Sequence, residues 1–280
     1  MRLDGSVALV TGAGSGIGRA IAVELSRRGA RLILLGRRQP GLEETRERLA
    51  RPLRAAVLTL DLAAPRERAG LAAQVAAMTS GLDLLVNNAG IVRAGALSDQ
   101  DDAIWREMLE VNLLAPMTIT RDLLPLLAAS SQGRVVNVGS MFGDIGFPFF
   151  AAYSASKFGL RGWSEALRRE LADQGVGVTY CAPRGARTPA SDGFQRYVRA
   201  FSMRLDATET VARRVVDGIA ADARDIYPIG PERFFLIVQR LLPRLIDGGL
   251  RRRVAAENKK AAFRLRSASP CNVPSAADSP

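Results

Sequence analysis

The stretch Thr11-Gly12-Ala13-Gly14-Ser15-Gly16-Ile17-Gly18 follows the short apolar run Val7–Val10 and leads into a segment with helical spacing. Its four glycines permit a sharp turn and a close approach of the backbone to a ligand. A helix N-terminus beside such a turn offers unpaired N–H groups and a positive dipole end, which suit a pyrophosphate. The stretch therefore predicts a dinucleotide at the first strand-to-helix turn. The alternative is a tight turn whose glycines serve packing.

Outward from this turn, short apolar runs alternate with longer segments of helical spacing. The candidate strands are Val7–Val10, Arg31–Leu35, Ala55–Leu60, Leu82–Val86, Arg134–Val138 and Val176–Cys181. None alternates cleanly between polar and apolar residues, which is typical of strands buried on both faces of a parallel sheet. The candidate helices are Ile17–Arg28, Leu42–Ala50, Arg66–Met78, Asp101–Leu127, Tyr153–Asp173 and Thr208–Ala223. This order favours a doubly wound, mainly parallel α/β sheet, Rossmann-like, with helices on both faces and a C-terminal helical extension.

The chain divides into three parts. Residues 1–230 contain no internal repeat and no linker, so we expect one nucleotide-binding catalytic domain, with a loop and short helical pieces over Pro183–Phe201. Residues 231–257 predict a basic amphipathic helical extension that breaks near Pro243 and at Gly248-Gly249. Residues 258–280 are expected to form a disordered tail.

Composition excludes several kinds of chemistry. The 280 residues include no histidine, which rules out Ser-His-Asp triads, Cys-His pairs and histidine metal sites. The two cysteines, Cys181 and Cys271, form no C-x-x-C motif, and we expect no metal site and a reducing compartment. Catalysis must then use Tyr, Lys, Ser, Asn, a carboxylate or a bound cofactor.

The net charge of +11 has an uneven distribution. Residues 1–229 hold 29 basic and 24 acidic side chains, whereas residues 230–280 hold 10 and 4. The body is only mildly basic and carries no recognition motif, so we expect no nucleic-acid partner. The N-terminus shows no signal-peptide pattern and no run reaches 18 apolar residues, so the expected location is cytoplasmic.

The end of the second candidate strand bears on the choice of nucleotide. Folds that prefer NAD place an Asp or Glu there to hold the ribose hydroxyls. This chain has Gly36-Arg37-Arg38 instead. Because arginine pairs bidentately with phosphate, Arg37 and Arg38 favour the 2′-phosphate of NADP(H) over NAD(H). The alternative is that arginine is simply this chain's usual basic residue.

Tyr153 and Lys157 lie four residues apart at the start of a predicted helix and so share one face of it. A nearby ammonium favours the phenolate and is expected to lower the pKa of the tyrosine toward working pH. Lys157 is the only lysine among the first 258 residues of a chain that otherwise uses arginine. Ser140 follows the end of strand Arg134–Val138, where ligands gather in open α/β sheets. These residues predict an acid/base site.

Taken together, these motifs make the chain resemble the single-domain short-chain dehydrogenase/reductases over about residues 5–230. The matching motifs, in the order the family has them, are Thr11–Gly18, Asp61-Leu62, Asn87-Asn88-Ala89-Gly90, Asn112, Ser140, Tyr153 with Lys157, and Pro183 to Thr188. The chain departs from the family in having Arg184 between Pro183 and Gly185. Arg184 is expected to alter the loop over the nicotinamide or to face an acidic substrate group.

The resemblance implies a role for each matching residue. Tyr153 would be the acid/base, Ser140 would orient the substrate oxygen, and Lys157 would bind the nicotinamide ribose. Asn112 would kink its helix and hold a water in a proton relay. Asp61 would contact the adenine and Asn88 the adenosine side. The implied cofactor-binding residues are Gly12, Ser15, Gly16, Ile17, Gly18, Arg37, Arg38, Asp61, Leu62, Asn88, Ala89, Gly90, Tyr153, Lys157, Ala186 and Thr188.

The resemblance implies hydride transfer between NADP(H) and a carbonyl or secondary alcohol. The alternative is a catalytically silent nucleotide-binding or scaffold protein of the same fold. Residues 141–150 contain four phenylalanines, which suggest an apolar pocket. Residues 231–257 could contact a membrane surface peripherally, which would favour a lipid-like or 3-oxoacyl substrate, or could cover the pocket or another subunit. A homodimer or homotetramer would pair through residues 101–127 and 153–173.

Overall fold

The computed structural model describes residues 1–230 and 232–268. Its centre is a seven-stranded sheet in the order β3-β2-β1-β4-β5-β6-β7, with every neighbouring pair parallel. The strands are β1 Val7–Thr11, β2 Arg31–Gly36, β3 Ala55–Thr59, β4 Leu84–Asn87, β5 Arg134–Val138, β6 Gly177–Cys181 and β7 Asp225–Ile226. The strand order reverses between β1 and β4, and such a switch point opens a crevice at the carboxyl ends of the strands.

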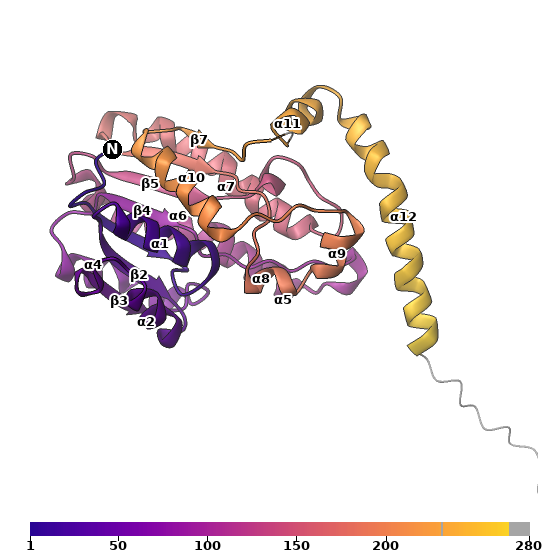
Figure 1. The fold of residues 1–280 in the computed structure, drawn as a ribbon, viewed down its shortest axis with the longest axis horizontal. Coiled ribbons are helices and arrows are strands. Elements are labelled where there is room, and N and C mark those ends of the chain that lie inside the picture. Colours follow the sequence, from indigo (N-terminus) through magenta and orange to yellow (C-terminus); the bar gives the residue numbers. More distant parts are fainter. Residues whose placement is uncertain (231, 269–280) are drawn as a thin grey trace, which may run out of the picture.

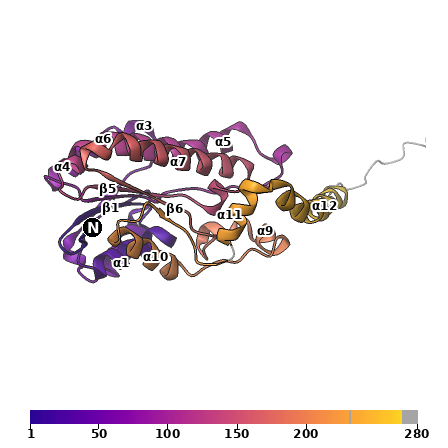
Figure 2. The same cartoon turned by 90° about the horizontal axis from the view of Figure 1, so that it is seen from above.

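Helices cover both faces of this sheet (Figure 2). On one face lie α1 Gly16–Arg27, α2 Gln39–Glu47 and α10 Thr208–Ala220. Their core residues, such as Ile21, Leu42 and Val215, pack against Val10 and Val136 of the strands. On the other face lie α3 Pro65–Arg68, α4 Leu71–Met78, α5 Asp102–Leu109, α6 Ala115–Ala128 and α7 Ala151–Glu170. The predicted doubly wound, Rossmann-like fold is confirmed.

The predicted elements are correct in type, but three details differ. The single helix expected over Arg66–Met78 is divided into α3 and α4 around Gly70. The helix expected over Asp101–Leu127 is interrupted between α5 and α6 by a π-helical turn, Glu110–Leu114. Strand β7 was not predicted, because a two-residue strand has no hydrophobic pattern to read.

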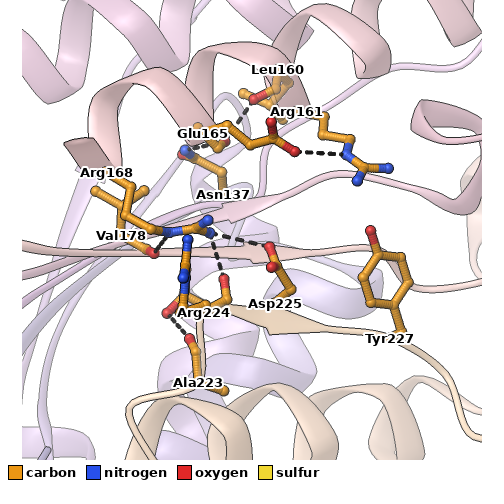
Figure 3. A network of polar contacts seen from close by, with 12 residues as sticks. Asn137, Leu160, Arg161, Glu165, Arg168, Val178, Ala223, Arg224, Asp225 and Tyr227 are labelled. Atoms are coloured by element: carbon orange, nitrogen blue, oxygen red, sulfur yellow. Dashed lines mark hydrogen bonds and ion pairs between the residues drawn. The ribbon is translucent and has the colours of Figure 1, made fainter. Parts of the chain in front are cut away.

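Strand β7 is fastened to the sheet by a side chain from α7 (Figure 3). Arg168 donates to the Val178 carbonyl at 2.9 Å and to the Arg224 carbonyl at 2.7 Å, and it pairs with Asp225 at 3.1 Å. The Thr179 hydroxyl adds a bond to the Ala223 carbonyl at 2.6 Å. These bonds compensate for the short backbone ladder and fix the direction in which the chain leaves the sheet.

Beyond β7 the chain forms α11 Glu232–Leu241 and α12 Pro243–Ala268, which we call the C-terminal helices. They lie at the end of the molecule opposite β3 and α4 (Figure 1). The break before Pro243 was predicted, but the predicted break at Gly248-Gly249 is wrong, because α12 runs through both glycines. The tail was expected to begin at residue 258, whereas α12 continues to Ala268. Residues 269–280 of that tail lie outside the described residues.

Across residues 1–230 and 232–268, no helix combines the length and the apolar character needed to cross a membrane.

Candidate active site

A cavity of about 740 Å³ opens at the carboxyl ends of the central strands. It runs from the glycine turn after β1 past Tyr153 to an aromatic region beneath the C-terminal helices. Every residue named for catalysis or cofactor binding from the sequence lines this cavity except Asn112. Residues far apart in the sequence therefore meet at the crevice where the strand order switches.

The glycine turn brings backbone unusually close to its neighbours. Gly12 has a φ of 66°, and a Cβ there would lie 2.9 Å from the Ala89 Cα. Gly16 has a φ of 56°, and a Cβ there would lie 3.0 Å from the Thr188 Cγ2. L-residues rarely adopt these angles, so both positions require glycine. Helix α1 begins at Gly16 with no acidic residue in its first turn, which leaves its positive end open to an anion.

Thr11 and Asn88 join this turn to the end of β4. The Thr11 Oγ1 accepts from the backbone N–H groups of Asn88 at 3.0 Å and Ala89 at 2.9 Å. In return, the Asn88 side-chain amide donates to the Thr11 carbonyl at 3.0 Å. Asn88 thus fixes the shape of the glycine turn from inside the cavity, a structural role that the sequence did not indicate.

Arg37 and Arg38 lie where β2 ends, and both are exposed at the rim of the cavity. The Arg37 guanidinium is 4.0 Å from the Asp61 carboxylate, which is itself 38% exposed. Such an open pair contributes little to stability and leaves the guanidinium available to a ligand. Leu62 is buried and forms part of the wall beside Asp61.

Ser140, Tyr153 and Lys157 meet at the centre of the cavity. Ser140 caps a short helical turn, and its Oγ accepts from the Phe142 N–H at 3.1 Å. Tyr153 and Lys157 both come from the first turns of α7, and the Lys157 Nζ lies 5.8 Å from the centre of the Tyr153 ring. The Lys157 ammonium donates to the Val138 carbonyl at 3.0 Å and is only 4% exposed.

Burial dominates the electrostatics of this group. It raises the pKa of Tyr153 to about 12, although a hydrogen bond with Ser140 acts in the opposite direction. It lowers the pKa of Lys157 to about 8. The expected lowering of the tyrosine pKa is therefore wrong for the protein's own atoms, because desolvation of the phenolate outweighs the hydrogen bond with Ser140. Tyr153 is protonated at neutral pH and can donate a proton.

Asn112 lies behind the cavity rather than on it. It is fully buried in the π-helical turn between α5 and α6. Its Oδ1 accepts from the Ile91 N–H at 2.8 Å, and its Nδ2 donates to the Ile91 carbonyl at 2.9 Å and to the Ser156 hydroxyl at 3.1 Å. Asn112 thereby holds the segment after β4 against α7, next to Lys157.

Arg184 occupies an enclosed position in the loop after β6. Its Nε lies 3.0 Å from the Asp206 carboxylate, and its Nη2 donates to the Ile229 carbonyl at 2.7 Å. The backbone of this loop also pairs with Asp206, through Arg187 N–H at 3.0 Å and the Gly185 carbonyl at 2.8 Å. Arg184 therefore anchors the loop that carries Ala186 and Thr188, in agreement with the expectation that it shapes this loop.

The aromatic end of the cavity contains three of the four phenylalanines that suggested an apolar pocket in the sequence, Phe142, Phe147 and Phe150. Phe142 and Phe147 stack with their centres 4.6 Å apart, beside Phe150 and Phe201. The fourth phenylalanine of residues 141–150, Phe149, stacks on Tyr197 and lines a neighbouring hollow of about 280 Å³ instead of the main cavity. The C-terminal helices complete the wall of the main cavity with Phe235, Leu245, Ile246, Gly249 and Leu250. Covering the pocket was one of the alternatives for residues 231–257, but the individual residues follow only from the path of the chain after β7.

The sequence model of the short chain dehydrogenase family matches residues 6–197. The chain belongs to the short chain dehydrogenase family. This confirms the family predicted from the motifs.

Three relatives show the range of proteins that this chain is similar to. Dehydrogenase/reductase SDR family member 7B of Mus musculus is 37% identical over 65% of this chain and 58% of its own length. Estradiol 17-beta-dehydrogenase 11 of Macaca fascicularis is 33% identical over 89% and 83%. The 3-oxoacyl-acyl-carrier-protein reductase FabG of Escherichia coli is 34% identical over 65% and 74%. The chain thus spans less than two thirds of the length of the first of these relatives.

Solved structures of the family match most of the chain. The RhlG–NADP complex of Pseudomonas aeruginosa superposes with a TM-score of 0.75 at 27% identity, over 81% of this chain and 95% of its own. An actinorhodin polyketide ketoreductase with NADPH gives a TM-score of 0.74 at 31% identity, over 82% and 98%. A Burkholderia phymatum dehydrogenase with NAD, at 24% identity and a TM-score of 0.79 over 88% and 96%, shares the fold.

Proposed function

We propose that this protein transfers a hydride between NADP(H) and the carbonyl or secondary alcohol of an apolar substrate, with Tyr153 as the acid/base. The observation that carries the proposal is the meeting of Ser140, Tyr153 and Lys157 in one cavity, between a glycine turn and an aromatic pocket. Three groups suited to proton transfer, a dinucleotide cradle and an apolar compartment are thus contiguous.

The residues present fit a dinucleotide phosphate. The glycine turn lets backbone approach a pyrophosphate, and the open N-terminus of α1 complements its charge. Arg37 and Arg38 are exposed at the rim and suit a 2′-phosphate, which supports NADP(H) over NAD(H). Asp61, Leu62, Ala89 and Gly90 would form the adenine and ribose walls, and Ala186 and Thr188 the nicotinamide wall. When bound, the cofactor supplies or accepts the hydride.

The protein's own part is to orient the substrate and move a proton. In reduction, the Tyr153 hydroxyl gives its proton to the substrate oxygen, which becomes the alcohol oxygen. The Ser140 hydroxyl, held by the Phe142 N–H, donates a second hydrogen bond to that oxygen. The Lys157 ammonium favours the resulting phenolate, which regains a proton from solvent. We propose that the relay of this proton passes the side of α7 that Asn112 holds.

The aromatic compartment supports a lipid-like or 3-oxoacyl substrate. Its phenylalanines offer apolar contact along a path that leads from Tyr153 to the C-terminal helices. Relatives and neighbours whose names refer to estradiol, a 3-oxoacyl-acyl-carrier-protein or a polyketide are compatible with such a substrate. We propose a homodimer or homotetramer in the cytoplasm; exposed Leu109, Leu114 and Phe158 on the helices around α7 support pairing there.

The test is NADPH oxidation with ketones of graded chain length and with acyl thioesters. We expect turnover that increases with chain length. Tyr153→Phe is expected to lower turnover by about 1,000-fold, a typical contribution of general acid catalysis, while NADPH binding changes by less than about twofold. Tyr227→Phe is the matched control, because this phenol contacts Asp144 and does not line the cavity.

Near-normal turnover of Tyr153→Phe would contradict the assignment. The catalytically silent scaffold is the second reading, and the complete Ser140, Tyr153 and Lys157 set argues against it. NADPH binding by the wild type without turnover on any carbonyl of the panel would support the scaffold instead.

A further inference from the structure

The C-terminal helices present apolar side chains in two directions. One set faces the body: Ile246, Leu250 and Val254 recur at intervals of four along α12, and Leu250 and Val254 pack against Phe150, Tyr197 and Phe201. Arg253 adds a hydrogen bond to the Phe201 carbonyl at 2.6 Å. The helices are therefore docked on the aromatic end of the cavity rather than extended into solvent.

The second set faces outward. Phe234, Ile237, Leu241, Leu242 and Leu245 are between 55% and 73% exposed, and we call them the outer apolar face. Of the thirteen large apolar side chains that are exposed in the described part of the chain, seven lie within residues 229–245. Single exposed apolar residues are ordinary, whereas a contiguous group marks an interaction surface.

Basic residues flank this face. Residues 234–259 contain six basic side chains and two acidic ones, of which Glu257 is buried. Arg240, Arg244, Arg251 and Arg252 are exposed. An apolar face with an arginine-rich border is the pattern of a helix that lies in a membrane interface and attracts anionic lipid. Two copies of this face related by a two-fold axis would bring like charges together, which disfavours a second subunit as its partner.

The outer apolar face is continuous with the cavity. Leu245 belongs to both, since it is 63% exposed and also lines the cavity. Phe235, next to Phe234, is 46% exposed and lines the cavity as well. The apolar path from Tyr153 therefore ends at the surface that the arginines border.

We propose that the C-terminal helices dock this protein on an anionic lipid bilayer, so that an apolar substrate enters the cavity directly from the bilayer at Phe235 and Leu245. Docking itself depends on the outer apolar face and its arginines. Entry of substrate from the bilayer rests on the proposed function.

The experiment is flotation of the full-length protein with vesicles of phosphatidylcholine alone or of phosphatidylcholine with phosphatidylserine. We expect wild-type protein to float with the anionic vesicles, and less so as salt is added. Phe234→Glu with Leu241→Glu should reduce binding by at least about tenfold through lost apolar insertion. Arg240→Glu with Arg244→Glu should reduce it by about thirtyfold or more, because each arginine contributes about a factor of five.

Leu53→Glu with Arg54→Glu is the matched control. Both residues are exposed and directly precede β3, which lies at the end of the molecule opposite the C-terminal helices (Figure 1), so this pair should float like wild type. Failure of wild type to float, or equal flotation of all variants, would overturn the proposal. The proposal would also be overturned if wild type did not bind vesicles and the Phe234→Glu, Leu241→Glu variant had a lower molar mass than wild type in light scattering. That result would identify the outer apolar face as a subunit interface.

Flotation is independent of turnover, so the two proposals can fail separately. Each variant is also assayed for NADPH binding and for reduction of a short soluble ketone, neither of which involves the outer apolar face. If wild type floats but turns over no carbonyl, lipid docking is supported and the proposed enzymatic function is contradicted. If wild type reduces ketones but does not float, the enzymatic function is supported and lipid docking is contradicted.

Discussion

Lys157 is a buried ammonium whose pKa falls to about 8 because burial removes it from water. In the unfolded chain this pKa is near 10.5, so the unfolded state binds more protons between the two values, and stability must rise with pH across that window. Urea unfolding of the cofactor-free protein should show a gain of about 2 kcal/mol between about pH 7 and about pH 10, relative to Lys157→Met.

Tyr153 limits the pH range over which stability rises. Its pKa is raised to about 12 in the folded protein, so the folded state retains a proton that the unfolded state loses above about pH 10. Stability should therefore fall again above that pH, and the fall should be smaller in Tyr153→Phe, where the raised pKa values of buried Tyr180 and Cys181 still contribute to it. Identical pH profiles for wild type and Lys157→Met would show that the ammonium is hydrated rather than buried.

Arg37 and Arg38 are expected to bind the 2′-phosphate of NADPH. Replacing both with alanine should raise the KM for NADPH by about tenfold or more, because each bidentate guanidinium–phosphate contact contributes more than about 1 kcal/mol. The KM for NADH, which has no 2′-phosphate, should change by less than about twofold. Steady-state kinetics with each cofactor would measure this. Arg46→Ala is the control, since Arg46 on α2 pairs with Glu43 and does not line the cavity.

The individual site residues were largely readable from the sequence because each follows a strand end or a helix start, and parallel strands bring their carboxyl ends to one edge. Asn112 was predicted to belong to the same group, but it lies behind the cavity, in a π-helical turn that the residue pattern does not indicate. The pKa of Tyr153 was misjudged, because the degree of burial depends on the phenylalanines packed around it and not on its distance from Lys157 along the helix.

At the scale of elements, the loop after β6 is held by Arg184. Arg184→Ala would leave the Asp206 carboxylate, which is 13% exposed, with Arg214 at 3.8 Å as its ion-pair partner within the described part of the chain. Removing one partner of a buried pair costs about 3 kcal/mol, so the melting temperature should fall by about 6 to 12 °C in calorimetry. Arg187→Ala, an exposed arginine of the same loop, should change it by less than about 2 °C.

This prediction separates the two roles expected for Arg184. If Arg184 instead bound an acidic substrate group, Arg184→Ala would raise the KM for an acidic substrate and leave the melting temperature unchanged. Its burial and its bond to the Ile229 carbonyl favour the structural role, since Ile229 leads directly into α11. The loop and the C-terminal helices are thus anchored by one side chain.

Elements that rest on long apolar periodicity were predictable, and elements that rest on tertiary contact were not. Strand β7 exists because Arg168 of α7 reaches across to Arg224 and Asp225. Helix α12 continues through Gly248-Gly249 because Ile246, Leu250 and Val254 on either side are held on the body. Docking of this kind offsets the low helix propensity of glycine, which local sequence rules had taken as a break.

At the scale of the whole molecule, the sheet and the C-terminal helices form different ends of the cavity. The switch point of the sheet brings the glycine turn together with Ser140, Tyr153 and Lys157 in one cavity. The far end of the cavity is closed by helices that lie beyond the family match, which ends at residue 197. Under the proposed function, substrate selection would depend on the part of the chain that the family pattern does not cover.

Docking of α12 should set the preference for chain length. Val254→Asp places a charge against Phe201 and Tyr197 and should release α12, which removes Leu245 and Leu250 from the cavity wall. Losing about 60 Å² of apolar contact corresponds to about 1.5 kcal/mol, so kcat/KM for a long-chain ketone should fall by about tenfold while that for a short ketone is unchanged. Ala256→Asp, exposed on the same turn, is the control and should alter neither. An equal fall for both ketones would mean that α12 supports the catalytic group itself rather than the length of the pocket.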